Sequence, residues 1–180
     1  MQSQFGNHNL ILYTNRETLR NICSKYCKTA LDSLDEIVLI LTYYESVKDW
    51  FMYLKDSSIC VEKYKNDGSL VVIESRKGFF GLLNDFVGIM IMIRMLLRRA
   101  NNLAKKGLTI ISDMGVFFPN RIEDLIKHET EISTSIQDLK VKIYCVYNKL
   151  DFESLREEQR QLLDSNHNRV ISVEDGEEGK

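Results

Sequence analysis

One carboxylate stands where the apolar pattern predicts a buried side chain. In the helix expected over residues 119–139, Glu129 falls in the middle of an apolar stripe made by Ile122, Leu125, Ile126, Ile132 and Ile136. A carboxylate in such a place must be hydrogen-bonded, paired with a cation or protonated. Perturbed carboxylates concentrate at functional sites, but structural ion pairs also produce them. Two interpretations stay open: Glu129 belongs to a site, or it lies at the stripe edge or pairs with a buried arginine.

Polar and aromatic side chains gather where the expected strands end. In an open parallel sheet, ligands bind beyond the carboxyl ends of the strands. The candidate ligand-binding residues at these ends are Tyr13, Thr14, Tyr43, Asp113 and Met114. We expect them to bind a small molecule, with Glu129 and Asp113 bordering one pocket together with Tyr13 and Tyr43. For Asp113, ligand hydrogen bonding and helix capping both stay open as roles.

Signals for catalysis are missing from the sequence. The segment Tyr13-Thr14-Asn15-Arg16 after the first strand has no glycine or lysine to wrap phosphates, and neither GxxxxGK[ST] nor GxGxxG occurs. The motifs GxSxG and HExxH are also absent, and the chain has only 3 histidines. We therefore expect a non-enzymatic protein with no catalytic residues, and no ATP bound through a phosphate loop.

The 4 cysteines do not form a recognisable metal framework. Cys23 and Cys27 lie one helical turn apart on an apolar stripe, while Cys60 and Cys145 stand alone, so no paired CxxC is present. Small buried side chains are the usual role of free cysteine, and metal or redox chemistry is the minor alternative for this pair. No metal site and no cofactor are expected.

Apolar β-branched runs alternate with helical patterns along the chain. The expected strands cover residues 9–13, 37–42, 70–73, 108–111, 141–147 and 169–173. The expected helices cover residues 15–32, 45–56, 79–105, 119–139 and 152–166. This alternation is typical of an α/β fold with three layers, in which a mostly parallel sheet lies between flanking helices. We expect a single domain over residues 1–173 and an acidic flexible tail at 174–180.

Composition excludes several classes of protein. With 180 residues, of which 44% are hydrophobic and 28% charged, the chain is neither disordered nor fibrous. Its net charge of −2 provides no positive electrostatic field that would attract nucleic acid, so nucleic acid is not expected as a partner. A run of about 20 apolar residues, needed to cross a bilayer, is missing, and no secretion signal is visible. A cytoplasmic protein without membrane contact is expected.

The helix expected over residues 79–105 is apolar on almost every side. A surface helix of one domain keeps one side toward solvent, so apolar residues all around the axis suggest a covered outer face. Its methionines Met90, Met92 and Met95 suit either an adaptable binding face or core filling. We expect a homodimer or a signalling partner to contact this helix.

The order of several landmarks resembles the MEDS family, the methanogen/methylotroph DcmR sensory domain. The landmarks are His8 before a strand ending in Tyr13, the Glu45-Ser46 turn, the strand from Gly107 to the pair Asp113-Met114, Glu129, Cys145-Val146-Tyr147, Phe152 and His167. They span residues 8–171, nearly the whole chain. The resemblance implies a RecA/KaiC-like core that has lost its phosphate loop, in agreement with the missing glycine and lysine.

The resemblance also implies a sensory module in signal transduction or transcriptional regulation, with hydrocarbon-derived small molecules as signals. The chain departs from the family pattern at Asp113, where a glutamate is usual, at Asn148, where an aspartate is common, and at Asn168, which replaces a proline. These departures bear on the ligand more than on the fold. Alternatives from other classes are a degenerate KaiC-like nucleotide-binding protein and an interaction scaffold acting through helix 79–105.

Overall fold

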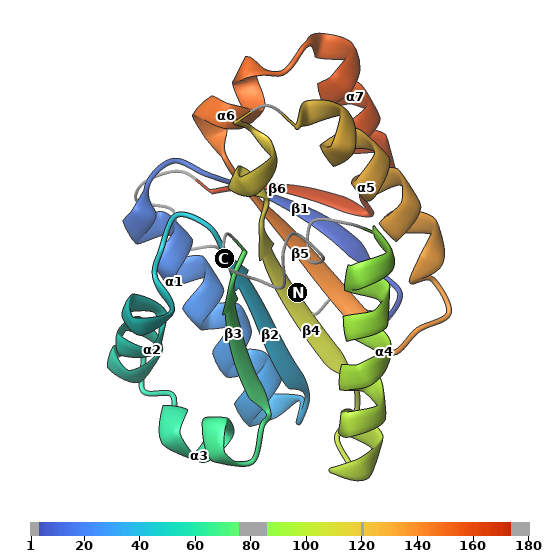
Figure 1. The fold of residues 1–180 in the computed structure, drawn as a ribbon. Helices are drawn as coiled ribbons and strands as arrows, with labels where there is room; N and C mark the ends of the chain where they lie inside the picture. The colour runs from blue at the N-terminus through green and yellow to red at the C-terminus, as the bar shows by residue number, and fades with distance from the viewer. Residues whose placement is uncertain (1–3, 76–85, 120, 174–180) are drawn as a thin grey trace.

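Six parallel strands form the centre of the structure, a computed structural model that describes residues 4–75, 86–119 and 121–173 (Figure 1). The strands are β1 (His8–Tyr13), β2 (Ile37–Thr42), β3 (Leu70–Glu74), β4 (Leu108–Asp113), β5 (Val141–Asn148) and β6 (Arg169–Val173). Their order in the sheet is β3-β2-β4-β5-β1-β6, and every neighbouring pair is parallel. The α/β class with a parallel sheet is confirmed.

Continuous apolar runs explain the inner strands. All residues of β2 are buried, and so are all but the last of β5, because both strands lie inside the sheet and are covered on both faces. The edge strand β6 is mostly exposed. The predicted bounds of β2 and β6 agree with the structure. The other strands extend one or two residues beyond the prediction, and β1 begins at His8.

Two helical layers cover the sheet (Figure 1). One face, called the α1 face, packs against α1 (Arg16–Lys28), the π-helical turn η1 (Thr29–Ser33), α2 (Val47–Asp56) and α3 (Val61–Asn66). The other face, called the α5 face, packs against α4 (Phe86–Asn102), the 3-10 turn η3 (Met114–Phe117), α5 (Ile122–Ser135), α6 (Lys149–Ser154) and α7 (Glu157–Asn166). Side chains alternate along each strand, so Leu10 enters the core on the α5 face and Ile11 the core on the α1 face.

The helices differ from the prediction in three places. The helix expected over 152–166 is two helices, α6 and α7, because the backbone is extended at Leu155 and Arg156. The N–H of Arg156 donates to Oε1 of Gln159 at 3.0 Å, which starts α7. The short helix α3 was not predicted, since fewer than two turns show no apolar period. The helix expected over 119–139 begins at Ile122 and ends at Ser135.

Of the helix expected over 79–105, residues 79–85 lie outside the described residues, and α4 covers the rest as far as Asn102, three residues before the expected end. The buried side of α4 includes Ile89, Met90 and Ile93. The outward stripe of α4, spaced by four residues, consists of Val87, Ile91 and Met95, which are 58%, 54% and 64% exposed. The expected tail at 174–180 also lies outside the described residues. Within the described part of the chain, no helix is long and apolar enough to cross a bilayer.

Candidate functional site

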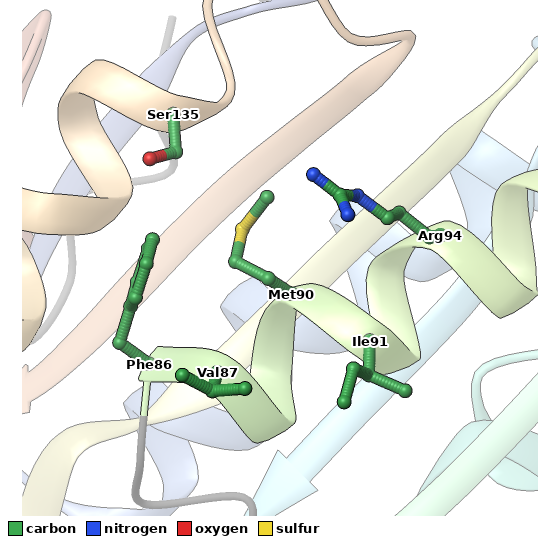
Figure 2. Close-up of a pocket in the computed structure, with 6 residues that line it drawn as sticks. All are labelled: Phe86, Val87, Met90, Ile91, Arg94 and Ser135. Atoms are coloured by element: carbon green, nitrogen blue, oxygen red, sulfur yellow. The ribbon is translucent and has the colours of Figure 1, made fainter.

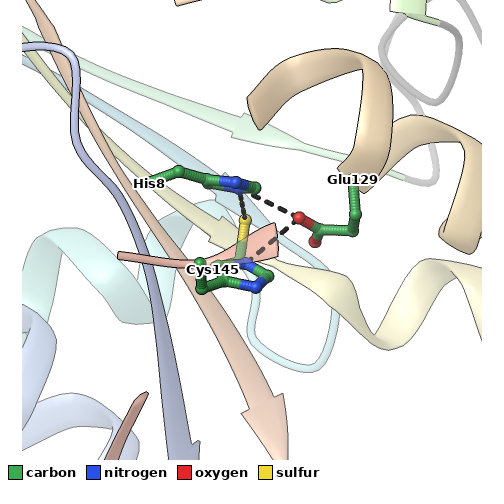
Figure 3. A group of neighbouring side chains, drawn as sticks. His8, Glu129 and Cys145 are labelled. Atoms are coloured by element: carbon green, nitrogen blue, oxygen red, sulfur yellow. Dashed lines mark hydrogen bonds and ion pairs between the residues drawn. The ribbon is translucent and has the colours of Figure 1, made fainter. Parts of the chain in front are cut away.

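A buried group of polar side chains lies in the otherwise apolar core of the α5 face. It consists of His8, Glu129, Cys145, Tyr147 and His167, and we call it the Glu129 cluster. Figure 3 shows His8, Glu129 and Cys145 pointing toward one another. The exposed fraction is 0% for Glu129 and at most 8% for the other members. Glu129 is thus buried, and its partners among the described residues are two histidines and a tyrosine rather than an arginine.

Strand register brings these side chains together from distant parts of the sequence. In the β1–β5 pair, the residue opposite Cys145 is Leu10, two positions after His8. Alternate residues of a strand point to the same face, so His8, Cys145 and Tyr147 all point toward the layer that contains α5. Glu129 reaches them from the middle of the buried stripe of α5.

His167 is held beside His8 by the turn between α7 and β6. The N–H of His8 donates to Oδ1 of Asn168 at 2.7 Å, and the N–H of Asn168 donates to the carbonyl oxygen of His8 at 2.6 Å. The two imidazole rings lie 4.1 Å apart between centroids and are tilted by 32°. Nδ1 of His167 is 2.6 Å from the carbonyl oxygen of Leu163. Because a carbonyl oxygen only accepts, this nitrogen carries a proton.

Both oxygens of Glu129 have polar neighbours. Oε1 accepts a hydrogen bond from the hydroxyl of Tyr147 at 2.5 Å. Oε2 lies 2.9 Å from Nε2 of His8 and 3.2 Å from Nε2 of His167. Nε2 of His8 is also 3.2 Å from Sγ of Cys145. The carboxylate is therefore the centre of the cluster.

Burial and these contacts determine the charges in the cluster. Burial alone raises the pKa of Glu129, but the two imidazoles outweigh it and hold this pKa well below its usual range. Burial lowers the pKa of His167, whereas the Glu129 carboxylate raises it, with a net increase. Burial and the same carboxylate both raise the pKa of Cys145 well above its usual value. These shifts favour a charged pair of Glu129 and His167 beside a neutral Cys145 thiol.

Four members of the cluster also offer atoms of the kind that bind metal ions. One nitrogen each from His8 and His167, one oxygen of Glu129 and Sγ of Cys145 all lie within 4.8 Å of one another. In the sequence, the histidines and Cys145 are landmarks of a family resemblance without an assigned role. For His8 and Cys145 the local signal is weak, a polar residue at an inward strand position, and His167, in the turn between α7 and β6, lacks even this signal. Cys23 and Cys27, by contrast, pack in the core on the α1 face, as expected for small apolar side chains.

A second polar group lies at the carboxyl edge of the sheet. It consists of Tyr13, Tyr44, Asp113 and Asp151, and we call it the edge group. Oδ2 of Asp113 accepts the N–H groups of Tyr43 and Tyr44 at 3.2 and 3.1 Å, and Oδ1 accepts the N–H of Gly115 at 3.0 Å. The hydroxyl of Tyr44 donates to Oδ2 of Asp151 at 2.5 Å.

Tyr13 is the most deeply buried member of the edge group. Its side chain is 1% exposed, and its hydroxyl has no hydrogen-bond partner among the described residues. Burial and the nearby Asp113 carboxylate raise the pKa of Tyr13, so the hydroxyl keeps its proton. A buried hydroxyl without a partner costs about 1–3 kcal/mol, which a bound polar atom would recover.

The predicted site residues divide among three places. The structure places Tyr13, Thr14, Tyr43 and Asp113 at the carboxyl edge, Met114 in the core on the α5 face, and Glu129 across the sheet from Tyr13. The expectation that Glu129 and Asp113 border one pocket is therefore wrong. Its physical cause is the alternation of side chains along β1 and β4, together with the packing of α5 on the opposite face. Ligand binding by these residues stays a prediction.

Asp113 should make the stability of the protein depend on pH. Burial raises the pKa of Asp113 from 3.8 to about 6, although three backbone N–H groups oppose the shift. The folded state then binds the proton more tightly than the unfolded state, so this contribution to stability is present below about pH 4 and is lost as the pH rises through about 6. We compare the wild type with Asp113→Asn, whose side chain does not titrate. The difference in unfolding free energy, wild type minus variant, should fall by about 2–3 kcal/mol across that range.

Urea denaturation at a series of pH values measures this difference. The exposed Asp56 on α2 provides the control, because Asp56→Asn should leave the pH dependence of the wild type unchanged. A difference between wild type and Asp113→Asn that stays constant or rises with pH would contradict the prediction.

A hollow of about 340 Å³ opens beside the first turns of α4. Its lining consists of Phe86, Val87, Met90, Ile91, Arg94 and Ser135. Figure 2 shows these side chains, with Ser135 on α5 facing the helix α4. The hollow shares Val87 and Ile91 with the outward stripe of α4, so the apolar surface of this helix is continuous with it.

Comparison with known proteins yields a family and a fold. The family model described as MEDS, MEthanogen/methylotroph, DcmR Sensory domain, matches residues 7–168. Among solved structures, a KaiC-like protein from the hyperthermophilic archaeon Pyrococcus horikoshii is similar, with a TM-score of 0.64 and 11% sequence identity. The similarity covers 97% of this chain and 76% of that chain. The search of curated proteins finds no match. At this identity, the structural similarity establishes a RecA/KaiC-like fold alone.

Proposed function

Because the chain belongs to the MEDS family of sensory domains, we propose that it is a sensory module that binds a small molecule and signals its presence to a partner, in signal transduction or transcriptional regulation. Family membership supports the sensory role. The proposal includes no catalysis, since the chain has neither a phosphate loop nor a nucleophile motif. In addition, the side chain of Asn15 caps α1 directly after β1, because its Oδ1 accepts the N–H of Thr18 at 2.9 Å. A protein side chain therefore occupies the helix start at which a phosphate loop would hold a nucleotide.

The proposed binding place is the carboxyl edge of the sheet around Tyr13. The single observation that carries this proposal is the buried hydroxyl of Tyr13, which has no hydrogen-bond partner among the described residues. A phenolic hydroxyl can donate one hydrogen bond and accept another. The rings of Tyr43 and Tyr44, with centroids 4.9 Å apart, offer apolar surface nearby. This chemistry suits a small hydrocarbon derivative with one polar atom, such as an alcohol, a ketone or a carboxylate.

Asp113 has a positioning role in this proposal. Both of its oxygens accept backbone N–H groups, which holds the turn after β2 that carries Tyr43 and Tyr44. Gly115 lets these rings pack against the backbone, because a Cβ at this position would lie 2.4 Å from the Tyr44 ring and 2.7 Å from the Tyr43 ring. The site therefore depends on Asp113 and Gly115 without contact between Asp113 and the ligand.

Removal of the Tyr13 hydroxyl should weaken ligand binding. The probes are short alcohols, ketones, carboxylates and alkyl amines, screened by thermal shift and followed by calorimetry. For a compound that binds, Tyr13→Phe should lower the affinity about 3–10-fold, which corresponds to one lost hydrogen bond. Without ligand, the variant should be more stable than the wild type by about 1–3 kcal/mol, because it removes a buried hydroxyl that has no hydrogen-bond partner among the described residues.

Tyr53→Phe on α2 is the matched control and should leave the affinity unchanged, because Tyr53 is not a member of the edge group and contacts Arg20 through its ring rather than its hydroxyl. Equal affinity of wild type and Tyr13→Phe would refute this binding place. ATP is included among the probes, and tight ATP binding would favour the alternative of a degenerate nucleotide-binding protein.

The outward stripe of α4 supports the proposal that this helix contacts a signalling partner or a second copy of the chain. Val87, Ile91 and Met95 are each more than half exposed, and the adjoining hollow extends this apolar surface. Contiguous apolar surface of this kind marks interaction sites in monomeric proteins. Arg94, also exposed, borders the stripe and would face acidic groups of a partner.

A further inference from the structure

We propose that the Glu129 cluster is a buried metal centre, in which Nε2 of His8, Nε2 of His167, Oε2 of Glu129 and Sγ of Cys145 bind one divalent ion of the zinc type. Nitrogen, sulfur and carboxylate oxygen are the donors that Zn²⁺ takes in proteins. The four come from β1, α5, β5 and the turn before β6, and are all buried. This centre is independent of the proposed ligand site at the carboxyl edge.

Distances between the donor atoms fit one small ion. In a tetrahedral site with bonds of about 2.0–2.3 Å, neighbouring donors are separated by about 3.3–3.8 Å. Oε2 of Glu129 lies 2.9 and 3.2 Å from the two imidazole nitrogens, and Nε2 of His8 lies 3.2 Å from Sγ of Cys145. All four donors lie within 4.8 Å of one another. The three measured separations are a few tenths of an ångström shorter than a tetrahedral site requires, so the donor atoms would move apart slightly to hold an ion.

Hydrogen bonds to groups other than the four proposed ligands leave Nε2 of His167 and Oε2 of Glu129 free for an ion. Nδ1–H of His167 donates a hydrogen bond to the carbonyl oxygen of Leu163, so the neutral ring has its lone pair on Nε2. The hydroxyl of Tyr147 binds Oε1 of Glu129, which leaves Oε2 toward the histidines. Such outer partners are usual around metal ligands, where they fix the tautomer of histidine and the orientation of a carboxylate.

The contact between Oε2 of Glu129 and Nε2 of His167 is close but poorly directed for hydrogen bonding. Oε2 of Glu129 and Nε2 of His167 are 3.2 Å apart, yet neither atom has a partner with hydrogen-bond geometry among the described residues. Unsatisfied buried polar atoms are rare in proteins and call for an explanation, such as an ion or a water. One ion between Oε2 of Glu129 and Nε2 of His167 would satisfy both atoms.

Charge balance favours the same conclusion. A divalent ion with one carboxylate, one thiolate and two neutral imidazoles has no net charge, which a fully buried site requires. Binding the ion displaces the proton of the Cys145 thiol, and the Nε2 proton of His167 where it is present, into solvent. Four protein ligands complete a tetrahedral shell, so the ion would tie β1, β5, α5 and the turn before β6 together, as structural zinc does.

Metal content and cobalt binding of the full chain, purified without a histidine tag, test the proposal. We expect about one zinc ion per chain, as in a four-ligand structural site. After removal of the metal with a chelator, titration with Co²⁺ should give one-to-one binding and a thiolate-to-cobalt absorption band. This titration uses the wild type, so it does not depend on the folding of any variant. If the purified chain holds no zinc and the Co²⁺ titration gives no absorption band, the proposal is wrong, and the cluster is a structural ion pair of Glu129 and His167.

Variants assign the ligands, with circular dichroism to verify folding. Cys145→Ser should remove the absorption band, whereas Cys60→Ser, which changes an exposed cysteine outside the cluster, should retain it. Tyr147→Phe should keep the band and weaken Co²⁺ binding about 10–100-fold, as loss of an outer hydrogen bond to a metal ligand does. A band that survives in Cys145→Ser would refute the centre. Tyr13→Phe should bind Co²⁺ like the wild type. The metal centre and the ligand site can therefore fail independently, and the two failures are distinguishable.

Discussion

Replacing Glu129 with alanine should lower the free energy of unfolding by about 3–5 kcal/mol, the usual cost of removing one partner from a buried ionic group. Alanine at this position leaves two buried imidazoles without their carboxylate, and the hydroxyl of Tyr147 without its acceptor. The expectation holds whether the carboxylate pairs with His167 or binds an ion, because both arrangements need its negative charge. Equilibrium denaturation in urea, with the midpoint and slope compared with the wild type, measures the loss.

Two further variants test whether the loss of stability comes from the charge of Glu129 and from its buried place on α5. Glu129→Gln keeps the shape and one acceptor oxygen, so it should cost about 1–3 kcal/mol. Glu123→Ala changes an exposed acid in the first turn of the same helix and should cost less than about 1 kcal/mol. A loss below about 1 kcal/mol for Glu129→Ala would mean that the carboxylate is solvated, and would contradict its place in the core.

Replacing Lys142 with methionine should also lower the free energy of unfolding by about 3–5 kcal/mol. Nζ of Lys142 lies 2.5 Å from Oε1 of Glu36, and the two side chains are only 5% and 3% exposed. The hydroxyl of Thr109 donates to the other carboxylate oxygen at 2.6 Å. Methionine keeps most of the volume of lysine but leaves the carboxylate buried without its cation. Urea denaturation at neutral pH measures this loss.

The double variant Glu36→Met/Lys142→Met tests whether the cost of Lys142→Met comes from the buried Glu36 carboxylate that it leaves without a cation. Because a buried ion pair can often be replaced by apolar side chains at little cost, the double variant should be more stable than Lys142→Met alone by about 1–4 kcal/mol. Asp124→Ala, which breaks the exposed pair with Arg121, is the surface control and should cost less than about 1 kcal/mol. Strictly additive losses in the double variant would show that Glu36 and Lys142 act independently.

The sequence alone determined the class of the fold and most of its elements. Continuous β-branched runs, such as residues 37–42, are local signals of strands that are covered on both faces, and their alternation with helices implies a parallel sheet. Local signals failed where a helix is short or interrupted. The helix α3 has too few turns for an apolar period, and the break at Leu155 depends on burial of its side chain in the core on the α5 face.

The position of Glu129 in the apolar stripe of α5 was likewise determined by the sequence, which left open whether its side chain is buried or lies at the stripe edge. Its partners were not, because His8, Cys145 and His167 meet it only through the pairing of β1 with β5 and β6. Strand order and register arise from contacts between residues far apart in the chain, which no local pattern encodes. The tertiary structure also decided that Glu129 and Tyr13 lie on opposite faces. The helix after β4 packs on the α5 face, whereas the alternation of side chains points Tyr13 to the α1 face.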